Sequence, residues 1–342
     1  MAPASRELDG ARVWVCGHTG MVGSALVRRL ARERCEVLTV PRAQLDLRRQ
    51  EAVERWVRRQ RPDVVVVAAA GVGGLQANAA HPVAVLADNL AITQHVIDAA
   101  ASAGGPRLLY LASSCVYPRA ASQPIGEEAL LTGPLEETNQ WYAMAKLAGL
   151  KLAEAYHREH GLDYVSAIPA NLYGPHDNFD PARGHVIPGL LRRMHEAART
   201  RAPAVDVWGS GTPRREFMHV DDCADALLHL LATYHRPEPC NVGSGDDTSV
   251  AQLARLVAGV TGFTGRLRFD RSRPDGMPRK CLDSSRLAAL GWSGGRPLAQ
   301  GLAETYAWFL AHVAPADAAA AAGDATASAT GAPAGGERKA LT

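Results

Sequence analysis

The stretch RVWVCGHTGMVGSALVRRL, residues 12–30, decides the fold. A short apolar run is followed directly by glycines at 17, 20 and 23 and then by a helical apolar pattern. Glycine lets the backbone turn sharply and approach a pyrophosphate, whose negative charge the amides and dipole of the following helix favour. The stretch predicts the first strand, loop and helix of a dinucleotide-binding sheet. By itself the GxxGxxG spacing is weak evidence, because the same glycines would also close a tight turn that binds nothing. The expected cofactor-binding residues here are Gly17, Thr19, Gly20, Met21, Val22 and Gly23.

The first half of the chain alternates between strand-like and helix-like segments. Continuous β-branched runs separated by helices are typical of a parallel sheet that is covered on both faces. We therefore expect an α/β fold with a Rossmann-type doubly wound parallel sheet over residues 10–170. The strand-like runs lie at 36–40, 63–70, 107–113 and 163–168, and the helical patterns lie at 21–33, 48–60, 84–103 and 140–160.

After Pro169 the segments become shorter. They predict a smaller C-terminal α/β substrate lobe over 171–312, built on the carboxyl ends of the sheet, with residues of about 215–245 returning to the first domain. The stretch HVDDCADAL suggests a helix capped by Asp221 or Asp222. The tail at 315–342 has almost no large apolar residue, so we expect disorder there. Strands are expected at 205–209, 216–220, 240–243 and 266–269, and helices at 187–199, 222–232, 250–260 and 298–312.

The composition argues against several classes of protein. The 342 residues are 47% hydrophobic and carry a formal net charge of +2, so neither nucleic acid nor an acidic membrane surface is an expected partner. Six scattered cysteines without a CxxC pair indicate reduced thiols and no metal site. No signal peptide precedes the first strand, and no apolar stretch approaches the roughly 20 residues that cross a bilayer. We expect a cytoplasmic protein.

The end of the second strand bears on the choice of cofactor. Enzymes that prefer NAD usually carry an acid there, which holds the ribose 2′-hydroxyl. This chain has Val40, Pro41 and Arg42 instead. Arg42 would suit the 2′-phosphate of NADP, although an ordinary solvated arginine is an equally simple interpretation. The nearest acid, Asp46, is expected beside the adenine ring.

Tyr142 and Lys146 lie four residues apart, on one face of a predicted helix. A phenol titrates near pH ~10, so a neighbouring ammonium would make it a useful proton donor or acceptor near neutrality. The pair follows the serine-rich strand end LASSCVYP, residues 111–118. Together with the glycine loop, these features resemble the extended short-chain dehydrogenase/reductase superfamily. Tyr117 also lies beside the serines, but it has no lysine four residues on.

Longer stretches resemble the GDP-L-fucose synthase family, over about residues 10–312. They are GHTGMVGSA, AAAGVGGLQAN, SSCVYP, WYAMAKLAGLKL, PANLYGPHDNFDPARGHVIPGLLRRMHEA, VWGSGTPRREFMHVDDCA and PDGMPRKCLD. The resemblance implies a bifunctional 3,5-epimerase and NADPH-dependent 4-reductase that converts GDP-4-keto-6-deoxy-D-mannose to GDP-L-fucose, and a homodimer.

The resemblance also implies a role for individual residues. Cys115 would be the base and His185 the acid that invert C3 and C5, while Ser113 would hydrogen-bond the C4 oxygen. Tyr142 would exchange a proton with that oxygen, supported by Lys146. Further substrate-binding residues would be Ser114, Asn171, Arg193, Trp208, Arg215 and Lys280. Further cofactor-binding residues would be Leu47, Ala69, Leu111, Pro169, Asn171, Leu172 and His185.

Three departures and three alternatives accompany the resemblance. Thr19 and Val40 stand where arginine is usual, which weakens 2′-phosphate recognition and leaves NAD use open, and Gly71 replaces a usual lysine.

The same chemistry on another GDP-linked 4-keto sugar, either a deoxy sugar or a heptose, is one alternative. Epimerisation without reduction is a second. A nucleotide-sensing module without catalysis is a third, which the intact Tyr142 and Lys146 disfavour.

Overall fold

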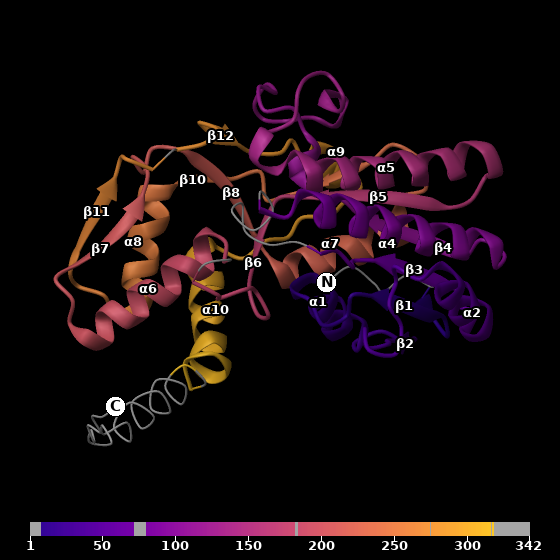
Figure 1. Cartoon of the computed structure of the whole chain (residues 1–342), viewed down its shortest axis with the longest axis horizontal. Coiled ribbons are helices and arrows are strands. Elements are labelled where there is room, and N and C mark those ends of the chain that lie inside the picture. Colours follow the sequence, from indigo (N-terminus) through magenta and orange to yellow (C-terminus); the bar gives the residue numbers. More distant parts are fainter. Residues whose placement is uncertain (1–7, 72–79, 182–183, 274, 316, 318–342) are drawn as a thin grey trace, which may run out of the picture.

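The computed structural model describes residues 8–71, 80–181, 184–273, 275–315 and 317. Its largest sheet has six parallel strands in the order β2-β1-β3-β4-β5-β9 (Figure 1). The expected α/β fold class is thus confirmed. The sixth strand of the sheet comes from the segment near residue 240. The strands are β1 (Arg12–Cys16), β2 (Glu36–Leu38), β3 (Val64–Val67), β4 (Arg107–Leu111), β5 (Tyr164–Pro169) and β9 (Cys240–Val242).

Helices cover both faces of this sheet, as the alternation of strand side chains requires. In β1, Val13 and Val15 pack with helices α1 (Met21–Leu30) and α7 (Val220–Thr233). Trp14 and Cys16 point the other way, toward α2 (Gln50–Gln60), α4 (Pro82–Ser102) and α5 (Gln140–His160). Both layers are mainly apolar, and each buried aliphatic side chain contributes about 1.5–3 kcal/mol.

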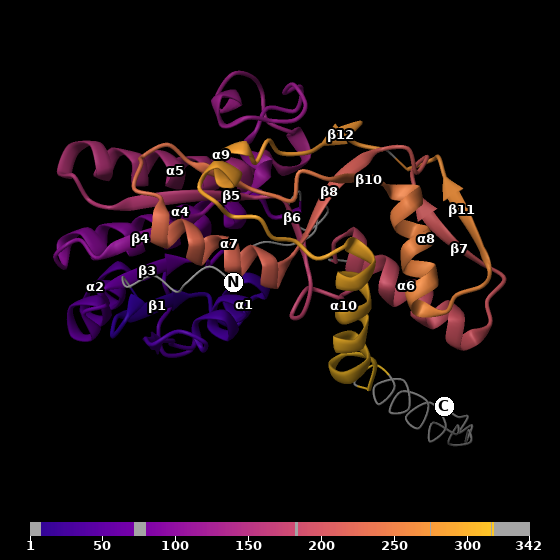
Figure 2. The same cartoon turned by 180° about the vertical axis from the view of Figure 1, so that it is seen from behind.

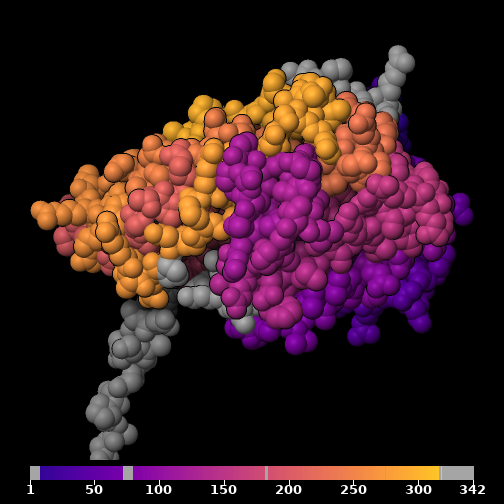
Figure 3. All heavy atoms as spheres, turned by 90° about the horizontal axis from the view of Figure 1, so that it is seen from above, coloured from indigo at the N-terminus to yellow at the C-terminus, as the bar shows by residue number. Residues whose placement is uncertain are grey.

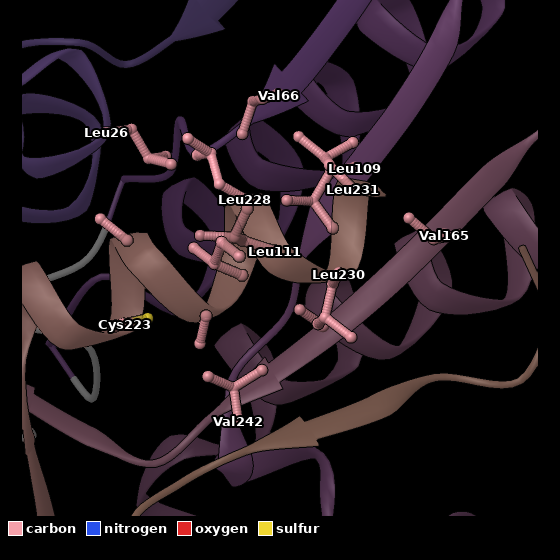
Figure 4. Packing of buried hydrophobic residues seen from close by; sticks show 14 of the residues in the cluster. Leu26, Val66, Leu109, Leu111, Val165, Cys223, Leu228, Leu230, Leu231 and Val242 are labelled. Carbon is pink, nitrogen blue, oxygen red and sulfur yellow. The ribbon is translucent and has the colours of Figure 1, made fainter. Parts of the chain in front are cut away.

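Figure 4 shows the first of these two layers from close by. Leu228, Leu230 and Leu231 of α7 lie among side chains of the sheet that include Val66 and Leu109. A helix from the second half of the sequence therefore completes the core of the first domain.

The order of the strands reverses between β1 and β3. In open parallel sheets, ligands bind where such a reversal opens a crevice at the carboxyl ends of the strands. The glycine loop follows β1 at this place, and Ala69 follows β3. The sheet topology therefore locates the expected dinucleotide site.

The smaller lobe has its own sheets and its own core (Figures 1 and 2). Strands β10 (Asp247–Ser249), β8 (Arg214–His219) and β12 (Arg279–Lys280) adjoin in that order, and β6 (Asn171–Tyr173) pairs with β8. A second sheet pairs β7 (Ala204–Trp208) with β11 (Arg266–Asp270). The helices of this lobe are α6 (Val186–Thr200), α8 (Val250–Thr261) and α10 (Leu298–His312), whereas α9 (Ser285–Ala289) returns to the large sheet, where Leu287 joins the core that α1 and α7 cover.

The segment between β4 and α5 contains three short 3₁₀ helices, at Ser114–Val116, Glu127–Ala129 and Glu137–Asn139. Figure 3 shows this segment in purple, spread over one face next to orange residues of the smaller lobe. Ile125 joins the two parts, since its amide donates to the carbonyl of Cys281 at 2.8 Å.

The structure corrects the expected cap of α7. The helix begins at Val220, and the ring of His219 accepts the amide of Asp221 at 3.2 Å. Asp221 and Asp222 are not caps because both lie inside the first turn, where they pair with Arg28 and Arg296 respectively.

Two further expectations concern the C-terminal tail and membrane-spanning helices. The expected disorder at 315–342 lies, apart from Pro315 and Asp317, outside the described residues. Asp317 pairs with Arg192 of α6 at 2.8 Å. Within the described part of the chain, no helix combines the length and the apolarity that a membrane span requires.

Candidate active site

The glycine loop has the tight geometry that its sequence predicts. Gly17 has φ +82°, and a Cβ there would lie 2.7 Å from Cα of Ala69. A Cβ on Gly23 would lie 2.1 Å from the carbonyl oxygen of Gly17. The loop and the helix therefore approach each other so closely that only glycine fits at these two positions.

The start of α1 offers amides to an anion. Gly20 occupies the N-cap position and provides no side-chain cap, and no acid lies in the first turn. Thr19 and Gly20 are exposed, and Met21 and Val22 are half-buried. An uncapped, accessible helix start beside a glycine loop fits the pyrophosphate of a dinucleotide.

At the adenosine end, the two charged candidates differ in their surroundings. Asp46 accepts Arg48 at 2.7 Å, and this contact holds the pKa of Asp46 well below its usual range. Arg48 also reaches Asp88 at 3.0 Å. Arg42 is exposed and makes no hydrogen bond or ion pair within the described part of the chain. Arg42 is therefore the cation available to a phosphate here.

Tyr142 and Lys146 lie on the buried face of α5, only 8% and 3% exposed. The Lys146 Nζ donates to the Leu111 carbonyl at 2.8 Å and lies 5.8 Å from the centroid of the Tyr142 ring. Burial lowers the pKa of Lys146 to about 8 and raises that of Tyr142 well above its ordinary value.

These contacts correct one expectation. We predicted that the ammonium would bring the phenol toward neutrality, but it is directed to a backbone carbonyl, and desolvation dominates at Tyr142. The phenol is therefore protonated at neutral pH. This is the form that can donate a proton to the oxygen of a ketone as it is reduced.

The thiol of Cys115 lies one 3₁₀ turn after β4, together with Ser113. The Ser113 Oγ accepts the amide of Cys115 at 3.4 Å. Burial raises the pKa of the thiol, while the charges of Lys280 and Lys146 and the hydrogen bond to Ser113 oppose that rise. Ser113 is partly accessible, whereas Ser114 is only 3% exposed. Ser113 is thus better placed than Ser114 to meet a ligand.

Tyr117 is buried and has a structural role. Its hydroxyl donates to Oδ1 of Asn241 at 2.6 Å, and the residue is 3% exposed. This contact ties the serine-rich turn to β9. Tyr117 therefore takes no part in the proton transfers that the site could perform.

His185 occupies the N-cap position of α6, with a side chain that is 52% exposed. Its Nδ1 lies 3.9 Å from Oδ1 of Asp177, which raises the pKa of the imidazole. Within the described residues, no direct contact joins His185 to Cys115. The structure groups Ser113, Cys115 and Lys146, while His185 comes from the smaller lobe.

Four predicted substrate residues lie on the smaller lobe. Trp208 is 51% exposed, and the guanidinium of Arg193 lies 5.7 Å from its ring centroid. Arg215 and Lys280 are neighbours in the register of β8 and β12. Within the described residues, Arg193, Arg215 and Lys280 make no ion pair with a carboxylate. Cations without a carboxylate partner suit the phosphates of a nucleoside diphosphate, and the accessible indole beside Arg193 suits its base.

Strand alternation separates these cations from their neighbours. Arg214 and Arg279 also pair in register, but both of their guanidinium groups bind the carboxylate of Asp247. Since successive side chains of a strand point to opposite faces, Arg215 and Lys280 share the other face. Asp247 thus neutralises one face of this small sheet and leaves the other positive.

Most of the remaining predicted cofactor residues lie at or just past the carboxyl ends of strands, and Leu47 lies in the segment between β2 and α2. Ala69 stands against Gly17, and the carbonyl of Leu47 lies 3.1 Å from the ring of His95. Pro169 ends β5, and Leu172 lies in β6. The side-chain amide of Asn171 donates to the carbonyl of Glu216 at 2.9 Å, so its NH₂ group is engaged with β8.

Sequence reasoning missed three acids: Asp177, Glu216 and Asp247. Asp177 stands in the segment NLYGPHDNF, eight residues before His185, and an acid so close to a proposed catalytic histidine was the only available signal. The partners of Glu216 and Asp247 depend on strand pairing, which no local pattern indicates.

Comparison with known proteins decides the family. Residues 13–243 match the NAD dependent epimerase/dehydratase family. The chain belongs to this family. It is therefore an NAD(P)-dependent enzyme, and the glycine loop and the Tyr142–Lys146 helix are the parts of this epimerase/dehydratase chain that fit the dinucleotide.

Individual relatives of this epimerase/dehydratase chain are more specific. A GDP-L-fucose synthase of Sinorhizobium fredii is 50% identical over 307 residues, which make up 90% of this chain and 98% of the relative. A GDP-L-fucose synthase of Escherichia coli is 49% identical over 309 residues, which are 87% of this chain and 96% of that relative. A solved GDP-L-fucose synthetase of Naegleria fowleri, bound to NADP, superposes with a TM-score of 0.81 at 29% identity, covering 88% of this chain and 94% of that one. The resemblance to GDP-L-fucose synthases is thus confirmed.

Proposed function

We propose that this chain is a bifunctional 3,5-epimerase and NADPH-dependent 4-reductase that converts GDP-4-keto-6-deoxy-D-mannose to GDP-L-fucose. The observation that carries the proposal is the position of Cys115. It shares a 3₁₀ turn with Ser113 and lies within electrostatic reach of Lys146 and Lys280. A plain reductase has no task for this thiol. The relatives at about half identity support the same reaction.

Inversion needs a base on one face of the sugar and an acid on the other. The C–H bonds at C3 and C5 flank the C4 ketone and are therefore acidic. Cys115, as the thiolate, removes one of these protons, and Ser113 donates a hydrogen bond to the C4 oxygen while enolate charge develops there. His185, as the imidazolium, returns a proton to the opposite face. Each inversion leaves a neutral thiol and a neutral imidazole, which exchange protons with solvent before the next.

Reduction follows at C4. The bound nicotinamide supplies the hydride for the carbonyl carbon. Tyr142 gives its phenolic proton to the C4 oxygen, and the Lys146 ammonium stabilises the phenolate that remains. The high pKa of Tyr142 in the free protein keeps the proton available for this step.

The GDP part of the substrate would lie on the smaller lobe. Arg215 and Lys280 project from one face of β8 and β12, and guanidinium and ammonium groups suit diphosphate oxygens. Trp208 and Arg193 would contact the nucleotide from β7 and α6. This arrangement recognises the nucleotide and leaves the identity of the sugar to the turn at Ser113 and Cys115.

The preference for NADPH rests on Arg42, the cation at the end of the second strand. Thr19 and Val40 supply no further positive charge. We therefore expect a modest preference for NADPH over NADH. Arg42→Ala should remove most of it, as judged by kcat/KM with each cofactor.

The deciding experiment is a substrate panel with products identified by NMR. GDP-4-keto-6-deoxy-D-mannose with NADPH should give GDP-L-fucose and consume an equal amount of cofactor. Turnover only of another GDP-linked 4-keto deoxy sugar or heptose would move the assignment to that sugar. Unchanged cofactor with altered stereochemistry would indicate epimerisation alone, and no change in any substrate would overturn the proposal.

Two variants separate the halves of the mechanism. Tyr142→Phe should block reduction while still allowing solvent deuterium to enter C3 and C5. Cys115→Ser should lose at least 100-fold in deuterium entry, as expected when a positioned base is removed. Exchange at the wild-type rate in Cys115→Ser would show that the thiol is not the base.

We further propose a homodimer that pairs through α4 and α5. These adjoining helices carry the exposed apolar side chains Leu90, Trp141 and Met144, which are 36%, 40% and 49% exposed. Burying such residues against a second copy would remove them from water. Light scattering should give the mass of a dimer for the wild type and of a monomer for the double variant Leu90→Glu, Met144→Glu.

A further inference from the structure

Asp177 is a buried acid in the loop between β6 and α6. Its side chain is 4% exposed. Its Oδ1 accepts the amide of Asn178 at 2.7 Å, and its Oδ2 is buried with no hydrogen-bond partner among the described residues. A carboxylate buried in this way costs stability unless a nearby cation compensates it. The nearest candidate is His185, whose Nδ1 lies 3.9 Å from Oδ1.

The loop that carries Asp177 is held in place by ring contacts with α10. The ring of His176 lies 5.0 Å from that of Trp308, and Phe179 packs on both Trp308 and Phe309. Arg192 of α6 donates to the carbonyl of Phe179 at 2.8 Å. In Figures 1 and 2, α10 lies beside α6, so the acid sits on an anchored loop.

The ring of His185 has one charged neighbour among the described residues. It is half exposed, and within the described residues its Nε2 makes no hydrogen bond. Asp177 is the one charged group that the described residues place within ion-pair distance of its ring. Arg192, on the same helix, is already paired with Asp317. The orientation of the imidazole is therefore set by a single carboxylate.

We propose that Asp177 is a positioning residue for His185: its carboxylate takes the hydrogen bond from Nδ1–H and leaves Nε2 as the nitrogen that exchanges a proton with the sugar. The inference rests on the proposed function, in which His185 is the acid of the epimerisation. Nε2–H gives its proton to the sugar carbon, and the ring becomes neutral imidazole with the remaining proton on Nδ1. Asp177 stays a carboxylate throughout, so no proton passes to it.

The arrangement has a measurable consequence. An adjacent carboxylate favours the imidazolium, and the pKa of His185 is raised by Asp177. A histidine with a higher pKa remains a competent acid at higher pH. Removing the carboxylate should therefore shift the alkaline limit of proton exchange to lower pH.

The experiment uses the full chain with Asp177→Asn. The NMR titration of the His185 imidazole should show a pKa lower by about 1 unit. The alkaline limb of deuterium entry into GDP-4-keto-6-deoxy-D-mannose, measured without NADPH, should move down by the same amount. Asp177→Glu should restore part of both shifts. Asp180→Asn, a change to an exposed acid of the same loop, is the matched control and should move neither.

The outcomes distinguish this inference from the proposed function, because the imidazole titration needs no turnover. An unchanged His185 pKa in folded Asp177→Asn overturns the positioning role. A lowered pKa with an unchanged exchange profile shows that His185 is not the acid, and overturns both. If Asp177→Asn does not fold, the wild type still decides: with ¹⁵N-labelled histidine, the neutral ring should carry its proton on Nδ1, and a proton on Nε2 contradicts the inference.

Discussion

Burial and charge act in opposite directions on the pKa of Cys115 and on that of His185. At Cys115, desolvation raises the pKa of the thiol, and the ammonium groups of Lys280 and Lys146 oppose this rise. At His185, the neighbouring carboxylate outweighs desolvation. Burial therefore disfavours the thiolate of Cys115, whereas the carboxylate of Asp177 favours the imidazolium of His185.

Lys146 allows a prediction at the residue scale. Its pKa is about 8 in the folded chain, against an ordinary value of 10.5. Between these pH values the unfolded chain binds more protons, so the contribution of Lys146 to stability rises with pH across this window. Below pH 8, burying the charged group costs roughly 3 kcal/mol.

Lys146→Met should therefore be more stable than the wild type at pH 7, while its reductase activity falls. The difference in the free energy of unfolding should shrink by roughly 3 kcal/mol between pH 7 and pH 10.5, as measured by urea denaturation. Lys151→Met is the control, since Lys151 lies on the same helix but is 48% exposed and paired with Glu154. Parallel pH profiles for Lys146→Met and the wild type would contradict the prediction.

At the scale of elements, the alternation of side chains along β8 and β12 places their cations on two opposite faces of the small sheet. Arg214 pairs with Asp247, while its neighbour Arg215 donates, among the described residues, to two backbone carbonyls, at 2.8 Å and 3.5 Å. A charged hydrogen bond to a diphosphate is worth about 1.5–3 kcal/mol. Two adjacent arginines on one strand are thus expected to contribute unequally to nucleotide binding.

Arg215→Ala should weaken the binding of GDP by about 10- to 100-fold, measured by calorimetry. Arg214→Ala should change GDP affinity by less than about threefold, because the paired guanidinium faces away from the ligand. The loss caused by Arg215→Ala should diminish in high salt, since the contact is electrostatic. Equal effects of the two variants would refute the separation of the two faces.

On the scale of the whole molecule, Glu216 joins the two lobes. One oxygen of its carboxylate accepts the amide of Gly245 at 2.8 Å, and the other accepts that of Leu282 at 2.8 Å. Gly245 follows β9 of the large sheet, and Leu282 follows β12 of the small one. A Cβ on Gly243 would lie 2.2 Å from the same carboxylate, so glycine is needed for this close approach.

Glu216→Gln should destabilise the protein by about 1–3 kcal/mol, although it preserves the shape of the side chain. The new NH₂ group cannot accept a hydrogen bond, so one of the two backbone amides loses its partner. Hydrogen exchange should become faster at Gly245 or Leu282, and Glu238→Gln, at an acid that is 50% exposed, should leave both unchanged. Unaltered protection at both amides would show that Glu216 does not hold the junction.

The sequence by itself determined the large sheet and the candidates for its chemistry. The run Val64–Val67 and the glycines at 17, 20 and 23 are local signals, because strand burial and tight turns each act over a few residues. The helical period alone places Tyr142 and Lys146 on one face of the helix. Strands β6, β10 and β12 have only two or three residues each, too few to show a period.

Only the tertiary structure decided how these groups behave. Glu216 meets Leu282 across 66 positions, and Asp247 of β10 binds Arg214 of β8 and Arg279 of β12, whereas Arg215 has no carboxylate partner among the described residues. The pKa of Tyr142 is raised because the phenol is buried and because Cys115 and Tyr110 lie close to it, while the Nζ of Lys146 donates to the carbonyl of Leu111. Electrostatic and desolvation energies depend on distances through space, and a sequence pattern contains only distances along the chain.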